Sequence, residues 1–121
     1  MKITHLKSRI KKLSTNKYIN AKWNVKNALR KDILEIFYLD NIGFEKIRSK
    51  KAKVHWVFYL KQPLLDVSNC SSMIKILEDA IFTQDTVKQI SKVTIEIKDV
   101  TTIAEPNKHV WEMVYIKIIE Y

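Results

Sequence analysis

The chain has 121 residues, of which 46% are hydrophobic, so it is long enough to form one domain around a single core. Its 22 Lys and Arg exceed its 13 Asp and Glu, and the formal charge of +9 favours a polyanionic partner such as nucleic acid. A solvated lysine-rich surface without a partner is the alternative. The single cysteine excludes an intramolecular disulfide, and without a membrane span or secretion signal we expect a cytoplasmic protein.

The first forty residues predict a strand, a loop and a long helix. Residues 1–6 have the character of a short strand. Residues 8–20 are basic and polar with several turn formers, which indicates an ordered surface loop. Asn20 or Asn24 can cap a helix that reaches to about Asp40.

Three cations follow one side of this predicted helix. Lys22, Lys26 and Arg30 stand at i, i+4 and i+8, so a helix places them in a single ridge. Such a ridge can contact a nucleic-acid backbone. The alternative is a solvated face that serves only solubility.

The second half of the chain supplies three further strands and one more helix. Residues 52–60 are almost continuously apolar, which predicts a central strand covered on both faces, and Pro63 follows its end. Residues 88–98 alternate as a strand with one solvated face, residues 100–109 suggest a hairpin loop, and residues 110–119 form the last strand. The order predicts an α+β domain: a small mixed or antiparallel sheet of about four strands with two main helices packed on one face.

The stretch from 65 to 87 organises the chain. Asp66 begins it, Ser68 is a plausible N-cap of the following helix, and Asp85 lies in the loop beyond. One apolar stripe is expected on Cys70, Met73, Ile74, Leu77, Ala80 and Ile81. The opposite, polar side is expected to hold Ser72, Lys75 and Asp79, with Asn69 and Ile76 at its edge.

The acids of this stretch are a candidate metal site. Asp66, Asp79 and Asp85 would repel one another where they converge, unless a cation neutralises them. Mg²⁺ suits a carboxylate pair that also faces a substrate phosphate, and Lys75 can orient Asp79 or contact that phosphate. The alternative is an ordinary Lys75–Asp79 surface pair, with Asp66 as a turn residue.

The same residues resemble the RusA-like family of Holliday-junction endodeoxyribonucleases. The segment Asp66-Val67-Ser68-Asn69 is similar to that family's Asp-x-Asp-Asn helix start. Lys75 and Asp79 match its helix pair, and Gln84-Asp85 matches its Asp-Asp loop pair. Asn16-Lys17-Tyr18 looks like the family's N-terminal Asn-rich turn, and the order of strands and helices agrees along nearly the whole chain.

The resemblance implies a dimeric, Mg²⁺-dependent enzyme, with Mn²⁺ as a possible substitute, that nicks four-way DNA junctions symmetrically. It makes Asp66, Asp79 and Asp85 metal ligands, Lys75 a catalytic or phosphate-contacting amine, and Asn69 a support of the helix start. The DNA-binding residues would be Asn16, Lys17, Lys22, Lys26 and Arg30. A C₂ dimer fits a junction whose strands are related by a two-fold axis. Such small resolvases are often carried by phages.

Two family acids are replaced here, by Ser68 and Gln84. Compared with the family, the helix entry is longer by nearly a turn, which can bring Asp79 or Glu78 into the missing ligand position. We expect retained activity. The alternatives are a weakened site that binds junctions without cutting them, and a basic regulator whose acids serve only capping and solubility. Four aromatic residues are available for the core, a dimer interface or stacking on an opened junction: Tyr18, Trp23, Trp111 and Tyr115.

Overall fold

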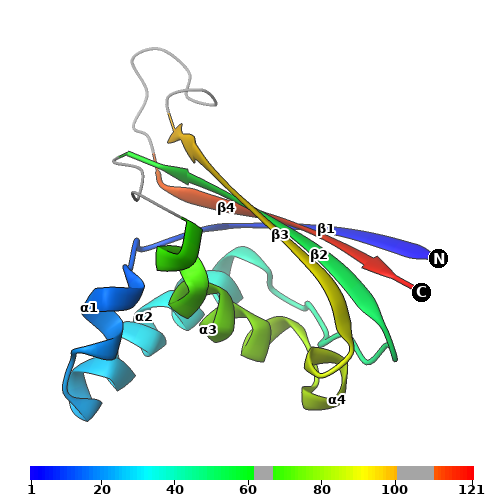
Figure 1. Ribbon diagram of the computed structural model, residues 1–121, viewed down its shortest axis with the longest axis horizontal. Helices are drawn as coiled ribbons and strands as arrows, with labels where there is room; N and C mark the ends of the chain where they lie inside the picture. Colours follow the sequence, from blue (N-terminus) through cyan, green and yellow to red (C-terminus); the bar gives the residue numbers. More distant parts are fainter. Residues whose placement is uncertain (62–66, 101–110) are drawn as a thin grey trace.

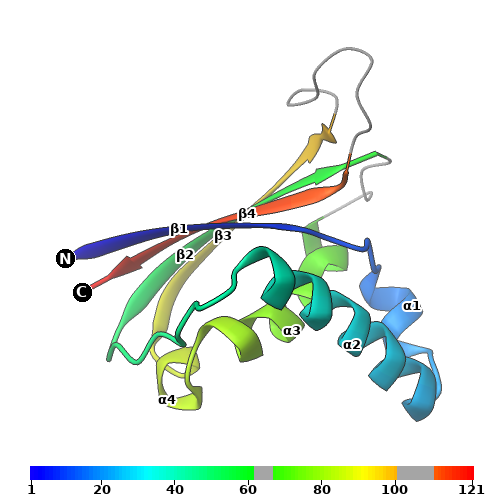
Figure 2. The ribbon, with the colours of Figure 1, turned by 180° about the vertical axis from the view of Figure 1, so that it is seen from behind.

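Four strands form one mixed sheet, and the helices lie on one side of it (Figures 1 and 2). The computed structural model describes residues 1–61, 67–100 and 111–121. The strands are β1 (Lys2–Arg9), β2 (Ala52–Leu60), β3 (Ile90–Asp99) and β4 (Met113–Glu120). The helices are α1 (Thr15–Ile19), α2 (Trp23–Asp40), α3 (Ser71–Ile81) and α4 (Gln84–Val87), with a 3-10 turn η1 (Val67–Cys70) before α3. The predicted α+β class, with two main helices, is confirmed.

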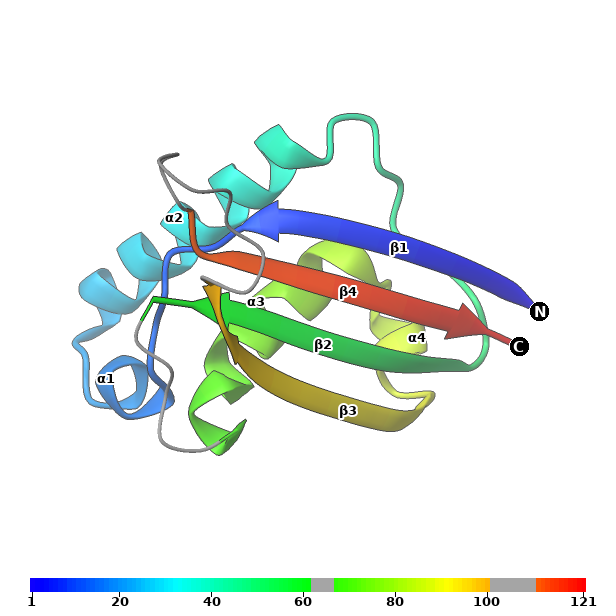
Figure 3. The ribbon, with the colours of Figure 1, turned by 90° about the horizontal axis from the view of Figure 1, so that it is seen from above.

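The strand order is β1-β4-β2-β3, which Figure 3 shows from the side of the sheet opposite the helices. β2 is antiparallel to β4 and parallel to β3, while β1 is antiparallel to β4. The predicted hairpin between the last two strands is therefore wrong, because β2 separates them. A parallel β2–β3 pair needs a crossover, and α3 supplies it. Residues 101–110, where that hairpin loop was expected, lie outside the described part of the chain.

β2 is central, as predicted, but the helices of the described residues cover only one of its faces. Its residues alternate between buried and partly exposed, and the inward Trp56 and Phe58 are fully buried. Their rings stack with centroids 6.4 Å apart. The outward Val57 and Tyr59 are apolar or aromatic as well, and this is why the sequence suggested cover on both faces.

Truncating the core ring gives a direct test of this orientation. Phe58→Ala is expected to cost about 3–5 kcal/mol of unfolding free energy, because it leaves a cavity beneath Trp56. The outward neighbour provides the control, and Val57→Ala should cost less than about 1 kcal/mol. Urea unfolding of both variants measures the difference. Equal losses would contradict the assigned inward and outward faces of β2.

Three helix boundaries differ from the prediction. The expected loop at 8–20 contains α1, whose cap is Ser14; its hydroxyl accepts a hydrogen bond from the Lys17 amide. The N-cap of α2 is Lys22, without a side-chain cap bond, so neither predicted asparagine serves. The N-cap of α3 is Cys70 rather than Ser68, because η1 continues the turn into the helix.

A charged clamp ties the end of β1 to the end of α2. The Arg9 guanidinium donates to Asp40 at 2.8 Å from Nη2 to Oδ1, and the Arg9 amide donates to Oδ2 at 2.8 Å. These hydrogen bonds hold the pKa of Asp40 below its ordinary value. The clamp fixes the end of α2 against β1, the edge strand of the sheet.

None of the helices in the described ranges combines the length and apolar character that a membrane span requires.

Candidate nucleic-acid interface and carboxylate row

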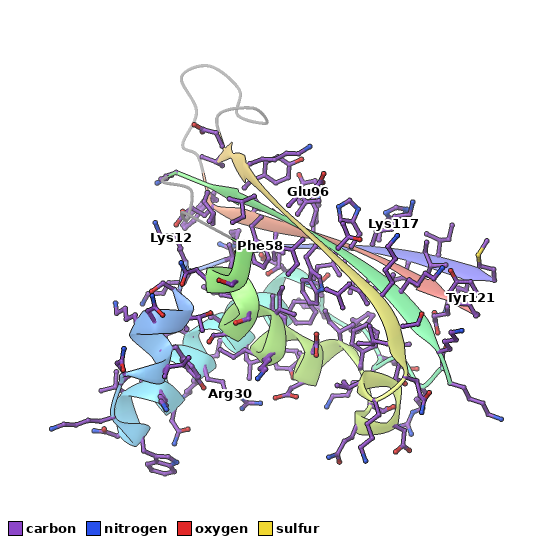
Figure 4. The ribbon with its side chains drawn as sticks, viewed as in Figure 1. Lys12, Arg30, Phe58, Glu96, Lys117 and Tyr121 are labelled. Carbon is purple, nitrogen blue, oxygen red and sulfur yellow. The ribbon has the colours of Figure 1, made fainter. Side chains whose placement is uncertain are left out.

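The cationic ridge of α2 runs along the side of that helix that faces α1 and α3. The Lys26 ammonium lies 5.8 Å from the centroid of the Tyr18 ring of α1. Arg30 Nη2 lies 3.1 Å from Asp79 Oδ2 of α3, and Figure 4 labels Arg30 near that helix. Lys22, at the start of the ridge, is exposed. Lys26 and Arg30 therefore face α1 and α3, and Lys22 is exposed one helical turn before Lys26.

A cleft of about 510 Å³ opens where this ridge meets α3. Its lining comes from α2, α3, α4 and the segment before β2: Arg30, Leu34, Tyr38, Lys46, Asp79, Phe82, Gln84 and Val87. Arg30 and Lys46 contribute two cations, and Asp79 contributes one carboxylate. A phosphate group entering this cleft would find guanidinium and ammonium donors together.

The polar side of α3 is narrower than predicted. Lys75 and Asp79 are exposed as expected, but Ser72 and Ile76 are buried, at 7% and 3% exposure. The reason is that α3 packs against both α2 and the sheet, so a wide arc of its surface is covered. The ion pair of Asp79 is with Arg30 rather than with Lys75.

The Glu78 side chain is half-buried and lies beside the charged side chains of Lys75 and Asp79. Burial raises the pKa of its carboxyl above the ordinary value, and the negative charge of Asp79 raises it further, while Lys75 opposes the shift. Two neighbouring acids of this kind favour a cation close by, and Arg30 is the cation that the described residues place against Asp79.

Asp85 lies in the first turn of α4, not in a loop as predicted. It is exposed, and the turn that carries it is fixed to the segment before β2. The Thr86 hydroxyl donates to the carbonyl of Ile47 at 3.1 Å and to that of Ser49 at 2.8 Å. These contacts hold the backbone of α4 next to the cleft, whose lining includes Gln84.

The predicted metal ligands are only partly described. Asp66 lies outside the described residues, and within them no group of three or more His, Cys, Asp and Glu side chains could hold a metal ion. Asp79 is already paired with Arg30. Mg²⁺ is commonly held by one or two carboxylates together with its own waters, so a pair of these acids would be enough, and whether they form one depends on Asp66.

The start of α3 is held by a residue that the sequence did not single out. Thr15 Oγ1 donates to the Asn69 carbonyl at 2.9 Å and accepts from the Ser72 amide at 3.1 Å. It also lies 3.1 Å from Ser71 Oγ. Asn69 takes part in this contact through its backbone carbonyl, and the role of its side chain at the helix start stays a prediction. The next residues of α1, Asn16 and Lys17, are exposed close to this contact.

Comparison with protein-family models and with curated proteins finds no match for this sequence. The arrangement of the side chains themselves must therefore support any functional assignment.

Proposed function

We propose that this protein binds branched DNA through the ridge of Lys22, Lys26 and Arg30 and the cleft beside it. The observation that supports this most strongly is the Arg30–Asp79 contact, which joins the ridge to the two neighbouring acids of α3, Glu78 and Asp79. A phosphate backbone held by the ridge would pass beside the acids rather than on a remote face. The net charge of +9 favours the same partner through counterion release.

We further propose that the protein is a Mg²⁺-dependent Holliday-junction endonuclease of the RusA-like kind, acting as a homodimer in the cytoplasm, with a phage as a possible source. Asp66 and Asp85 would hold the metal, and Asp79 would become a third ligand only if its ion pair with Arg30 were broken. A bound Mg²⁺ supplies charge stabilisation for phosphodiester hydrolysis and lowers the pKa of water. Lys75, exposed on the same side of α3 as Asp79, would contact the phosphate.

A junction-binding protein without nuclease activity is the second candidate. The Arg30–Asp79 ion pair favours it, because an arginine already neutralises one of the proposed ligands. Ser68 and Gln84 favour it too, since neither side chain brings the charge of a carboxylate. In this case the acids of α3 would orient Arg30 for DNA and would not take part in chemistry.

A cleavage assay on a four-way junction separates the two candidates. A labelled junction with a mobile core is incubated with the protein in Mg²⁺, in Mn²⁺ and in EDTA, after binding has been measured under the same conditions. Paired nicks at symmetric positions that require the divalent ion would support the endonuclease. Tight binding without nicks in either metal would support the binding protein, and failure to prefer the junction over a linear duplex would contradict both.

A further inference from the structure

The face of the sheet opposite the helices is a second surface with its own character. Side chains at the outward positions of the strands point away from α2 and α3, and Figure 4 shows Glu96 and Lys117 on the side away from Phe58. No helix of the described residues covers this face (Figure 3). We call it the open face.

The open face is strongly cationic. Its strands carry five outward lysines, one or two on each: Lys7, Lys53, Lys92, Lys98 and Lys117. The outward positions hold one carboxylate, Glu96, and its Oε2 lies 2.9 Å from His55 Nε2. Within the described residues none of these lysines forms an ion pair. Their charge is therefore free to meet a polyanion.

Aromatic rings lie among these lysines. Tyr59 of β2 and Tyr115 of β4 are neighbours, with ring centroids 5.2 Å apart and planes at 60°. The Lys98 ammonium lies 6.0 Å from the centroid of the Tyr59 ring. At the other end of the sheet the Lys53 ammonium lies 5.1 Å from the centroid of the Tyr121 ring. Tyr59 and Tyr121 thus each lie next to a cation, and Tyr115 lies against Tyr59.

The open face is also hollowed across the strands. One hollow of about 360 Å³ lies over β1, β4 and β2, with Tyr115 in its lining. A second of about 150 Å³ lies over β2, β3 and β4. Both are lined by His55 and Lys117, so they adjoin and form one shallow trough that runs from β1 toward β3.

We propose that the open face binds a single-stranded nucleic acid, with the phosphates on the five lysines and unpaired bases stacked on Tyr59 and Tyr115. Aromatic rings exposed on a sheet recognise unstacked bases, and a base that stacks in this way need not have a particular sequence. A duplex would not use the rings, because its bases are already stacked and paired. The site is on the opposite side of the sheet from the α2–α3 cleft, and it does not depend on nuclease activity.

The charge of the open face argues for this occupant over a second copy of the chain. Two copies packed face to face would bring five unpaired lysines of each against those of the other. Among the described strand residues Glu96 is the only outward carboxylate, and it is already hydrogen-bonded to His55. Like charges buried in an interface without partners are costly, whereas a phosphate backbone neutralises them.

The test is fluorescence anisotropy with labelled oligo-dT and oligo-U of about 12 nucleotides, a length that one such face can contact. Tyr115→Ala and Tyr59→Ala should each weaken binding by roughly 5- to 150-fold, the range expected when one stacked base is lost. The pair Lys53→Ala/Lys117→Ala should reduce the slope of log K against log salt by about 1.4, since each phosphate contact to a single strand contributes about 0.7.

The control pair Lys31→Ala/Lys50→Ala removes the same charge from exposed positions outside the four strands and should leave the anisotropy titration close to that of the wild type. Circular dichroism melts of all variants exclude unfolding as the cause of a loss. Unchanged binding in both tyrosine variants would overturn the proposal. So would light scattering that shows a dimer converted to a monomer by Tyr115→Ala without loss of oligonucleotide binding. Junction binding and cleavage through the α2 side are measured separately, so their failure would leave this result intact.

Discussion

Asp66→Asn and Asp85→Asn are each expected to lower Mg²⁺-dependent nicking of a four-way junction by at least roughly 100-fold while junction binding persists. A metal-supported phosphodiester hydrolysis depends on several kcal/mol of charge stabilisation, and each factor of ten in rate corresponds to about 1.4 kcal/mol. Asparagine keeps the shape of the side chain but removes the negative charge that holds a cation. Single-turnover cleavage at saturating protein measures the chemical step apart from binding.

Glu35→Gln is the matched control, because it removes one acid from an exposed position of α2, where Glu35 pairs with Lys31 at 3.7 Å. It should leave the cleavage rate near that of the wild type. If all three variants cut at the wild-type rate, Asp66 and Asp85 have no part in the reaction. If the wild type itself does not cut, the two aspartate variants should still bind the junction, as the non-catalytic candidate requires.

Much of the fold could be predicted because the signals are local. The alternation along β3 and β4 and the apolar stripe of α3 each lie within about ten residues, so period alone identifies them. The pairing of β2 with β3 could not be predicted in this way. Whether two strands pair in parallel depends on the path of the chain between them, which here runs through α3. The outward side chains Val57 and Tyr59 are apolar or aromatic, so the sequence did not indicate which face of β2 the helices leave open.

In the candidate site too, local features could be predicted from the sequence but contacts between distant segments could not. The exposure of Lys75 and Asp79 follows from helical periodicity, and the structure confirms it. The Arg30–Asp79 pair joins residues 49 positions apart, and the contact of Thr15 with the start of α3 spans 54. No spacing rule within one segment predicts such contacts. The convergence of Asp66, Asp79 and Asp85 remains a prediction, because Asp66 lies outside the described residues.

The double variant Lys26→Ala/Arg30→Ala is expected to weaken binding of a four-way junction by roughly 10- to 100-fold near 0.1 M salt, because two phosphate contacts are lost. The slope of log K against log salt should fall by about 1.8, since each duplex phosphate contact contributes about 0.9. The pair Lys31→Ala/Lys50→Ala removes equal charge elsewhere and should change neither value appreciably. Anisotropy titrations from 50 to 200 mM salt measure both quantities.

Removing Arg30 also leaves Asp79 unpaired, so part of the loss could come from a bare carboxylate beside the phosphate. Asp79→Asn resolves this, because it frees the Arg30 guanidinium without placing a negative charge next to it. If Arg30 contacts DNA, this variant should bind the junction at least as tightly as the wild type. If Asp79 instead serves to aim Arg30 at the backbone, binding should weaken and the salt slope should fall by about 0.9. Wild-type binding and slope in the Lys26→Ala/Arg30→Ala variant would remove the α2 ridge from the interface altogether.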